Sequence, residues 1–169
     1  MAGTQIREVM EKLSRTLTEQ PEKARVKNAV ATAGLVDGLK CTVTGPAGEM
    51  LQTDMPAGIG GGGSAPNPGW YMRAALASCN ATCIAMLAAR RNLNLSKLEV
   101  TVSSETDNRG LLGLDDQVSA GMQSLRVQVI IGAPGASREE LAELVHWACG
   151  HSPVGCSDLS SARIDVQVQ

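Results

Sequence analysis

Two cysteines, Cys79 and Cys83, lie four residues apart in an alanine-rich stretch of the chain. In an α-helix this spacing places both thiols on one face, one turn above the other. A cysteine in such a position is a candidate nucleophile if a neighbouring group stabilises its thiolate. Free cysteine is also among the most buried residue types, so both can equally be packing residues. A disulfide between them is not expected, because their side chains project in parallel.

A second group of reactive side chains occurs near the C-terminus, in the segment CGHSPVGCSD. It contains Cys149, His151, Ser152 and Cys156. Together with the first cysteine pair, these side chains include the sulfur and imidazole ligands that zinc prefers. Their spacing is unlike that of paired zinc knuckles, so a structural zinc site ranks behind the alternatives below. For His151 alone, partnership with a helix end is favoured over a role as catalytic base.

The first cysteine pair is positioned by residues 67–91, which are predicted to form one long, largely buried helix. Asn67 can cap its N-terminus, and Pro68 suits the first helical position. Arg90 and Arg91 suit the negative end of the helix dipole. Apolar side chains recur at helical spacing with alanines between them, which indicates packing on several sides: Met72, Leu76, Cys79, Cys83, Met86 and Leu87.

The region before this helix is predicted to contain another helix and a small sheet. Residues 4–18 form an amphipathic pattern whose apolar stripe must pack on the domain or on a second copy of the chain. Short apolar runs at 26–33, 39–44 and 49–53 are separated by turn signals and predict a meander of antiparallel strands. Cys41, in the second run, is expected to be a packing residue.

A glycine-rich segment, PAGIGGGGSAPNP, joins the meander to the helix. Gly58, Gly60 and Gly63 formally match a dinucleotide fingerprint, but an antiparallel meander is not the βαβ context that such a site requires. No cofactor is therefore expected. We interpret the segment either as a mobile loop at a pocket mouth or as a place where another backbone approaches closely.

After the helix, alternating residues predict strands near 98–103 and 125–131. The long connection between them is expected to tuck Leu111, Leu112 and Leu114 against the domain. Ser137 and Glu140 form a capping box for a second helix that ends at Gly150. A final alternating strand at 164–168 is expected to pair in the same sheet as the earlier strands.

Composition restricts the classes of function. The 169 residues fit one domain, and the net charge of −2 with 2% aromatic residues argues against nucleic-acid binding. The charged N-terminus does not resemble a signal peptide, and no uninterrupted apolar run is expected to reach membrane-spanning length. Five cysteines without framework spacing fit a reducing compartment. A cytoplasmic protein that does not act on membranes is therefore expected.

The helix sequence NPGWYMRAALASC, the strand that follows it and the later HSPV turn resemble the OsmC/Ohr family of organic hydroperoxide reductases. The resemblance covers 24–169 and leaves 1–23 as an N-terminal amphipathic helical extension. It implies an α/β (α+β) fold in which antiparallel-rich sheets wrap around two central helices, assembled as an intertwined homodimer. It also implies an antioxidant activity in the stress response, in which a thiol reduces organic peroxides.

By this resemblance, Cys79 is the peroxide-reacting nucleophile and Ser152 stands at the position of the family's resolving cysteine. Gly69 replaces a glutamate that helps to hold the thiolate in relatives. Arg25, with Lys40 as an alternative, is the candidate for the cation that stabilises the thiolate.

A serine cannot form a disulfide, so a different group must resolve an oxidised Cys79. Cys156 is favoured because it follows Pro153-Val154-Gly155 in a bendable loop, whereas Cys149 is fixed in a helix. A low-molecular-weight thiol is the competing reductant. The rival function is a non-catalytic protein that binds a small apolar ligand in a pocket lined by Met72, Met86 and leucines.

Overall fold

The computed structural model describes residues 2–158 and 164–166. Its helices are α1 (Ala2–Glu19), α2 (Pro68–Arg90), α3 (Asn108–Leu111) and α4 (Arg138–Cys149), with short 3₁₀ helices η1 (Pro21–Ala24) and η2 (Ala57–Ile59). Its strands are β1 (Thr32–Asp37), β2 (Lys40–Thr44), β3 (Met50–Thr53), β4 (Lys97–Thr106) and β5 (Met122–Gly132). The predicted α+β class, with antiparallel pairing throughout these strands, is confirmed.

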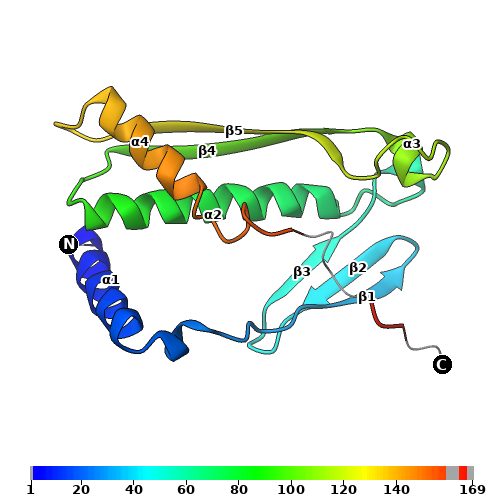
Figure 1. The fold of residues 1–169 in the computed structure, drawn as a ribbon. Helices are drawn as coiled ribbons and strands as arrows, with labels where there is room; N and C mark the ends of the chain where they lie inside the picture. The colour runs from blue at the N-terminus through cyan, green and yellow to red at the C-terminus, as the bar shows by residue number, and fades with distance from the viewer. Residues whose placement is uncertain (1, 159–163, 167–169) are drawn as a thin grey trace.

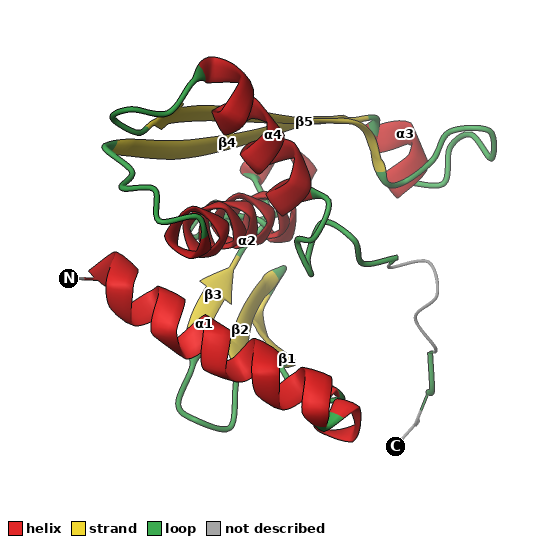
Figure 2. Ribbon diagram, turned by 60° about the vertical axis from the view of Figure 1, so that its left-hand side comes forward, coloured by secondary structure: helices red, strands yellow, loops and turns green. Residues whose placement is uncertain are grey.

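Helix α2 runs through the middle of the molecule (Figure 1). The β4–β5 hairpin and α4 cover one side of it, and α1 and the β1–β3 sheet lie on the other side (Figure 2). The predicted bounds of α2 are confirmed, since Asn67 Oδ1 accepts a hydrogen bond of 2.8 Å from the Trp70 amide. This cap satisfies one of the N–H groups that the first turn leaves without a partner.

The main core forms where α2, α4 and the hairpin meet. Ile84 and Leu144 are fully buried there, together with Leu87, Ala88 and Ala148. The hairpin contributes the paired residues Leu98 and Ile131 and the pair Val100 and Val129, which lie on its inner face. Alternation in the sequence therefore predicted the correct face of both strands.

The first strand of the meander does not lie where the sequence predicted it. Residues 26–31 have no strand partner, and Val26 and Val30 are exposed. Strand β1 instead continues to Asp37, where the Asp37-Gly38 turn sets the register with β2. The hairpin turn determines which residues of β1 and β2 pair. The position of the strand therefore follows from the turn and not from the apolar run before it.

The connection between β4 and β5 also differs from the prediction. It contains the short helix α3, and Leu111, Leu112 and Leu114 are exposed in this protomer and not tucked against it. The Asp107 carboxylate accepts hydrogen bonds from the Arg109 amide and guanidinium, which organise the turn locally. Polar contacts within the turn, and not burial of leucines, therefore hold it.

The described strands form two separate sheets, β1-β2-β3 and β4-β5, in agreement with the plural sheets that the resemblance implies. Of the predicted last strand, residues 164–166 are described and are not assigned to a strand, and the remainder lies outside the described residues. The β1–β3 sheet is attached to α2 by the Tyr71 hydroxyl, which donates a 2.9 Å hydrogen bond to the Gln52 carbonyl.

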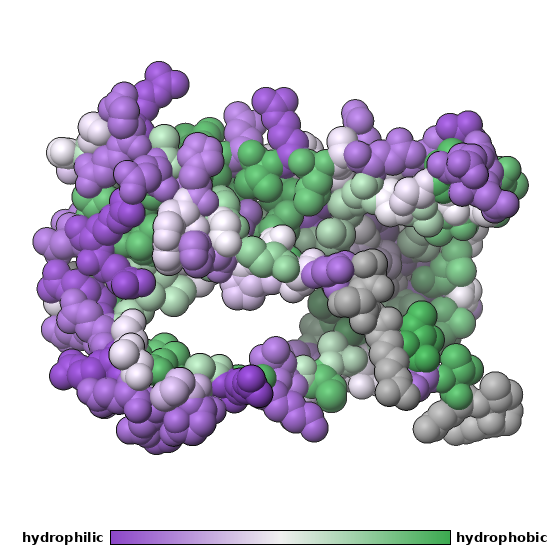
Figure 3. Space-filling view, viewed as in Figure 1, coloured by the Kyte–Doolittle hydropathy of each residue, from purple (hydrophilic) through white to green (hydrophobic). Residues whose placement is uncertain are grey.

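Helix α1 packs on α2 at one end of the molecule, where Arg7 donates a 2.7 Å hydrogen bond to Asn92. Much of its apolar stripe remains uncovered, and Val9 and Leu13 are more than half exposed at 61% and 51%. Figure 3 shows an opening through the protomer between α1, α2 and the linker to β1, with apolar side chains on its rim. The helix prediction is thus confirmed, and the protomer covers only part of its apolar face.

Helix α2 is long and apolar enough, by length and composition alone, to cross a membrane. This differs from the expectation that no segment approaches such a length. Its packing against β4, α4 and α1 is that of the central helix of a folded domain.

Candidate active site

The sulfur of Cys79 lies beside a turn that follows α4. Ser152, whose side chain is fully buried, donates a 3.2 Å hydrogen bond from its hydroxyl to Cys79 Sγ. The structure therefore brings together the predicted nucleophile and the serine that the sequence singled out. The two residues come from the central helix and from the segment that leaves α4.

Local hydrogen bonds hold Ser152 in place. Its carbonyl accepts a 2.9 Å hydrogen bond from the Cys156 amide, and its hydroxyl oxygen accepts a 3.2 Å hydrogen bond from the Gly155 amide. A side chain at Gly155 would meet Ser152 Oγ at 3.3 Å and Leu76 Cδ1 at 3.4 Å, so the turn lies close against α2. The hydroxyl proton is consequently directed to the sulfur and not to the Gly155 amide.

Opposing effects act on the pKa of the Cys79 thiol. Burial raises it, but hydrogen bonds from the Ser152 hydroxyl, the Val154 backbone N–H and the Cys83 side chain lower it, and the net pKa is below the ordinary cysteine value. Donors that point at sulfur favour the thiolate, because they replace hydrogen bonds that water would otherwise supply. Hydrogen bonding thus partly replaces the cation that the sequence analysis sought.

The neighbouring thiol of Cys83 shifts in the opposite direction. Burial raises its pKa, and the negative charge of an ionised Cys79 raises it further. Cys83 therefore remains protonated when Cys79 ionises. Its Sγ also lies 3.9 Å from the His151 carbonyl oxygen. The shared helix face predicted from the four-residue spacing is consistent with this coupling, in which Cys83 acts as a donor to Cys79.

In this protomer the two predicted cationic partners are not among the groups that shift the pKa of Cys79, and their role stays a prediction. Arg25 lies in the exposed linker after η1, Lys40 begins β2, and neither contributes to the shift in the pKa of Cys79. At Gly69, the family's glutamate position, a side chain would meet Asn67 Oδ1 and Arg73 Nη1. In the described part of this protomer, the side chains whose hydrogen bonds lower the pKa of the Cys79 thiol are those of Ser152 and Cys83.

The other cysteines occupy distinct environments. Cys156 is exposed, and its Sγ donates a 3.2 Å hydrogen bond to the Gly150 carbonyl. Cys149 packs beside the core, where burial raises its pKa. Cys41 lies in β2, as predicted. All five thiols are free, and Cys156 as the resolving thiol stays a prediction.

His151 behaves as the helix-end partner that was favoured. Its Nδ1 lies 2.7 Å from the Trp147 carbonyl, and its ring stacks on the Trp147 indole at 3.7 Å. Within 2–158 and 164–166, no group of three or more His, Cys, Asp or Glu side chains is arranged to hold a metal ion. This result gives no support to the zinc alternative.

Sequence reasoning missed Asp54, which organises the glycine-rich loop. This buried carboxylate accepts hydrogen bonds from the Ser64 amide and hydroxyl, both 2.9 Å, and from the amides of Met55 and Gly62. These bonds hold the pKa of Asp54 below its ordinary value. A side chain at Gly61 would collide with the Met55 carbonyl, so the loop uses glycine for close backbone approach. Of the two interpretations of this segment, the close approach of another backbone is the one that the contact at Gly61 supports.

With its helices, strands and thiol site described, the protein can be compared with solved structures. The fold resembles that of solved OsmC and Ohr proteins. An OsmC-like protein of Mycoplasma pneumoniae has 17% identity and a TM-score of 0.66, with 78% of this chain and 86% of that chain covered. The organic hydroperoxide resistance protein OsmC of Legionella pneumophila has 22% identity and a TM-score of 0.58, covering 78% and 88%.

A third solved structure, the organic hydroperoxide resistance protein OhrB of Bacillus subtilis, has 22% identity and a TM-score of 0.52, covering 78% of this chain and 90% of that chain. The OsmC-like protein family matches residues 61–168. The chain therefore belongs to the OsmC-like family, as its resemblance indicated. Among proteins of curated function, none matches this sequence.

Proposed function

We propose that this protein is a thiol-dependent peroxidase that reduces organic hydroperoxides, with Cys79 as the nucleophile. The observation that carries the proposal is the Ser152 hydroxyl hydrogen-bonded to Cys79 Sγ, with the Val154 N–H and Cys83 as further donors. Its family includes proteins named for organic hydroperoxide resistance, in agreement with this chemistry.

The reaction begins with the Cys79 thiolate, which attacks the distal oxygen of the hydroperoxide. The sulfur–oxygen bond forms as the O–O bond breaks, and the products are a sulfenic acid and an alkoxide that takes a proton to become an alcohol. The donors around the sulfur increase the thiolate fraction at neutral pH. Burial of Ser152 keeps water from competing for its hydroxyl.

Reduction of the sulfenic acid needs a second thiol. We assign this role first to Cys156, which is exposed and lies four residues after Ser152 in the same turn. Attack of its thiolate on Cys79 would form a disulfide and release water. A low-molecular-weight thiol that enters from solvent performs the same step in the competing scheme.

A non-catalytic role is the second candidate, and one cavity supports it. A space of about 170 Å³ lies between α1, α2 and α4 and is lined by Met10, Met86, Leu87 and Trp147 among others. A space of this volume can hold at most a molecule of about the size of benzene. Cys83 also lines it, so a ligand there would lie one helical turn from Cys79. Met86 lines this cavity, which supports the binding proposal, whereas Met72 is exposed and does not line it.

We further propose that the working unit is a homodimer. Only eight apolar residues of this protomer are buried among those described, and Leu35, Val36 and Met50 of the β1–β3 sheet are largely exposed. A core of this size is small for a chain of 169 residues. Burial of these side chains by a second copy would supply the missing apolar contacts. Light scattering tests this, and a folded monomer at micromolar concentration contradicts it.

The peroxidase proposal is tested by the intact mass of the reduced protein before and after one equivalent of cumene hydroperoxide, with dimedone present to trap sulfenic acid. In Cys156→Ser, which lacks the proposed resolving thiol, we expect one dimedone adduct at Cys79, and the same adduct when Cys41→Ser is added as the matched control. In the wild-type protein Cys79 should carry either this adduct or the disulfide to Cys156. Cys79→Ser should give none. An unmodified Cys79 after peroxide exposure of the folded protein would favour the binding role.

A further inference from the structure

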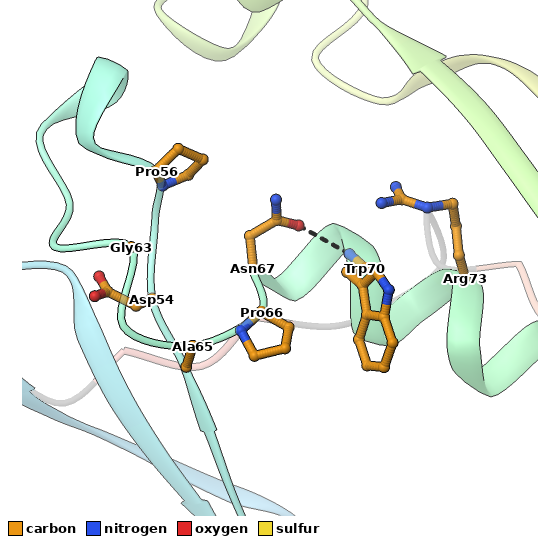
Figure 4. A pocket seen from close by; sticks show the side chains of 8 residues that line it. All are labelled: Asp54, Pro56, Gly63, Ala65, Pro66, Asn67, Trp70 and Arg73. Carbon is orange, nitrogen blue, oxygen red and sulfur yellow. Dashed lines mark hydrogen bonds between the residues drawn. The ribbon is translucent and has the colours of Figure 1, made fainter.

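A second cavity lies between the glycine-rich loop and the start of α2. Its volume is about 400 Å³, which is within the range of small-molecule sites. Residues 54–66 form one wall, and Asn67, Trp70 and Arg73 form the other (Figure 4). Cys79 does not line this cavity, so an inference about it does not depend on the peroxidase proposal.

Arg73 supplies the positive charge. Its Nη1 donates a 3.2 Å hydrogen bond to Ser104 Oγ of β4, which holds the half-buried side chain across the surface of α2. Among the described residues it forms no ion pair. A guanidinium carries five N–H donors in a fixed plane, so most of those on Arg73 remain available to an anion.

Asn67 supplies a second donor. Its Oδ1 is committed to the cap of α2, which leaves the Nδ2 group without a hydrogen-bond partner in the part of the chain that the structure describes. In Figure 4 this amide nitrogen and the Arg73 guanidinium lie on the same side of the Trp70 indole. The absence of a side chain at Gly69 keeps the space between them open, because a Cβ there would lie 3.3 Å from Asn67 Oδ1 and 3.6 Å from Arg73 Nη1.

Trp70 supplies the apolar surface. The residue is 48% exposed and lines the cavity, although burial of a large aromatic side chain such as tryptophan contributes strongly to stability. It is held edge-to-face against Tyr71, with the ring centres 5.1 Å apart. Pro56 and Pro66 add further rigid apolar groups to the cavity walls.

Asp54 is the only carboxylate that lines the cavity among the described residues, and its oxygens are already engaged by neutral hydrogen-bond donors of the loop. Its oxygens accept all four loop hydrogen bonds described above, and in Figure 4 they point away from Arg73. The partial positive charge at the N-terminus of α2 adds to the preference for an anion.

From these contacts we propose that the cavity binds a small amphipathic carboxylate. Its carboxylate accepts hydrogen bonds from Arg73 and from the Asn67 amide, and its apolar or aromatic part lies on the Trp70 indole. The ligand carboxylate occupies space that Gly69 leaves open.

The chain contains only two tryptophans, so nitrogen-labelled full-length protein provides an indole N–H signal for Trp70 and one for Trp147. Trp147→Phe assigns them. We titrate phenylacetate as the probe and phenylacetamide as its neutral counterpart. Phenylacetate should shift the Trp70 signal saturably and leave the Trp147 signal unchanged, while phenylacetamide binds at least about tenfold more weakly because charge-assisted hydrogen bonds are lost.

Arg73→Gln retains a donor for Ser104 and should weaken phenylacetate binding by about tenfold or more, whereas the exposed Arg138→Gln serves as the matched control and should have no effect. Gly69→Glu should block the site with an internal carboxylate.

Three results would each overturn the proposal: no saturable shift of the Trp70 signal, equal binding of phenylacetamide, or unchanged phenylacetate affinity in Arg73→Gln. Displacement of phenylacetate by equimolar inorganic phosphate would also overturn it, because the indole would then contribute nothing.

Discussion

The Ser152 hydroxyl donates a hydrogen bond to Cys79 Sγ across 73 positions of sequence. The two groups meet because α4 packs on α2 and the turn after α4 closes over the same face of α2. At a position where the family resemblance places a second thiol, this chain therefore has a group that can stabilise a thiolate but cannot form a disulfide with it.

Removal of this hydroxyl should make Cys79 less reactive. In Ser152→Ala, the pKa of Cys79 should rise because burial then acts against fewer hydrogen bonds. We expect the alkylation rate at neutral pH to fall about tenfold, the worth of one hydrogen bond to a charged group. The pH dependence of iodoacetamide modification measures this effect. Ser157→Ala, which removes a hydroxyl bonded to the Pro153 carbonyl in the same turn, is the control and should leave the profile unchanged.

Replacement of the same residue by cysteine should create a resolving thiol. The Ser152→Cys variant places sulfur near the present oxygen position, which lies 3.2 Å from Cys79 Sγ. Only a small rotation is needed to reach the sulfur–sulfur bond length. After one equivalent of cumene hydroperoxide, peptide mapping should identify a disulfide from Cys79 to the new thiol. If Cys79 instead gives the same product as in the wild-type protein, with no bond to residue 152, the turn does not present residue 152 as described.

The role of Cys156 can be separated from that of Cys149. The resolving scheme predicts a Cys79–Cys156 disulfide in peroxide-treated wild-type protein, absent in Cys156→Ser and retained in Cys149→Ser. Cys156 is exposed, whereas Cys149 packs beside the core. A mixed disulfide of wild-type Cys79 with added glutathione, formed equally in Cys156→Ser, would assign resolution to the low-molecular-weight thiol.

Asp54 should stabilise the fold in a pH-dependent manner. Its folded-state pKa is lowered by the loop hydrogen bonds, so its contribution is present above the unfolded carboxyl pKa and is lost as pH falls through the folded value. At neutral pH, Asp54→Asn should therefore reduce the melting temperature by several degrees. That difference from wild type should shrink as the pH is lowered below the ordinary carboxyl pKa. Thermal scans at several pH values test this, with the exposed Asp116→Asn as control.

Much of the fold follows from local sequence signals. Capping by Asn67 and Ser137 set the starts of α2 and α4, and alternation around Val100 and Val129 identified the buried face of the hairpin. Some of the failures share one cause. Apolar residues such as Val26, Leu111 and Leu112 were assumed to pack within one protomer, yet they are exposed there. An apolar pattern in the sequence predicts that a side chain is buried, but it does not predict which surface buries it.

The candidate site was predictable in part. The types and spacing of Cys79 and Ser152 singled them out, but their direct contact depends on how α4 lies on α2, which no local signal specifies. The search for a cation led to Arg25 because the family resemblance implies a cation that stabilises the thiolate. The donors include the Val154 backbone N–H, which every residue except proline carries and which sequence reasoning therefore cannot distinguish.

The division of the strands into two sheets has a consequence for how parts of the protomer unfold locally. The β1–β3 strands pair among themselves and make few contacts with the rest of the chain, whereas β4–β5 shares its core with α2 and α4. Amide hydrogens of β1–β3 in a separated protomer should therefore exchange with solvent well before those of β4–β5. The chain would then behave as two cooperative units of unequal stability, with the Cys79 site in the more stable one.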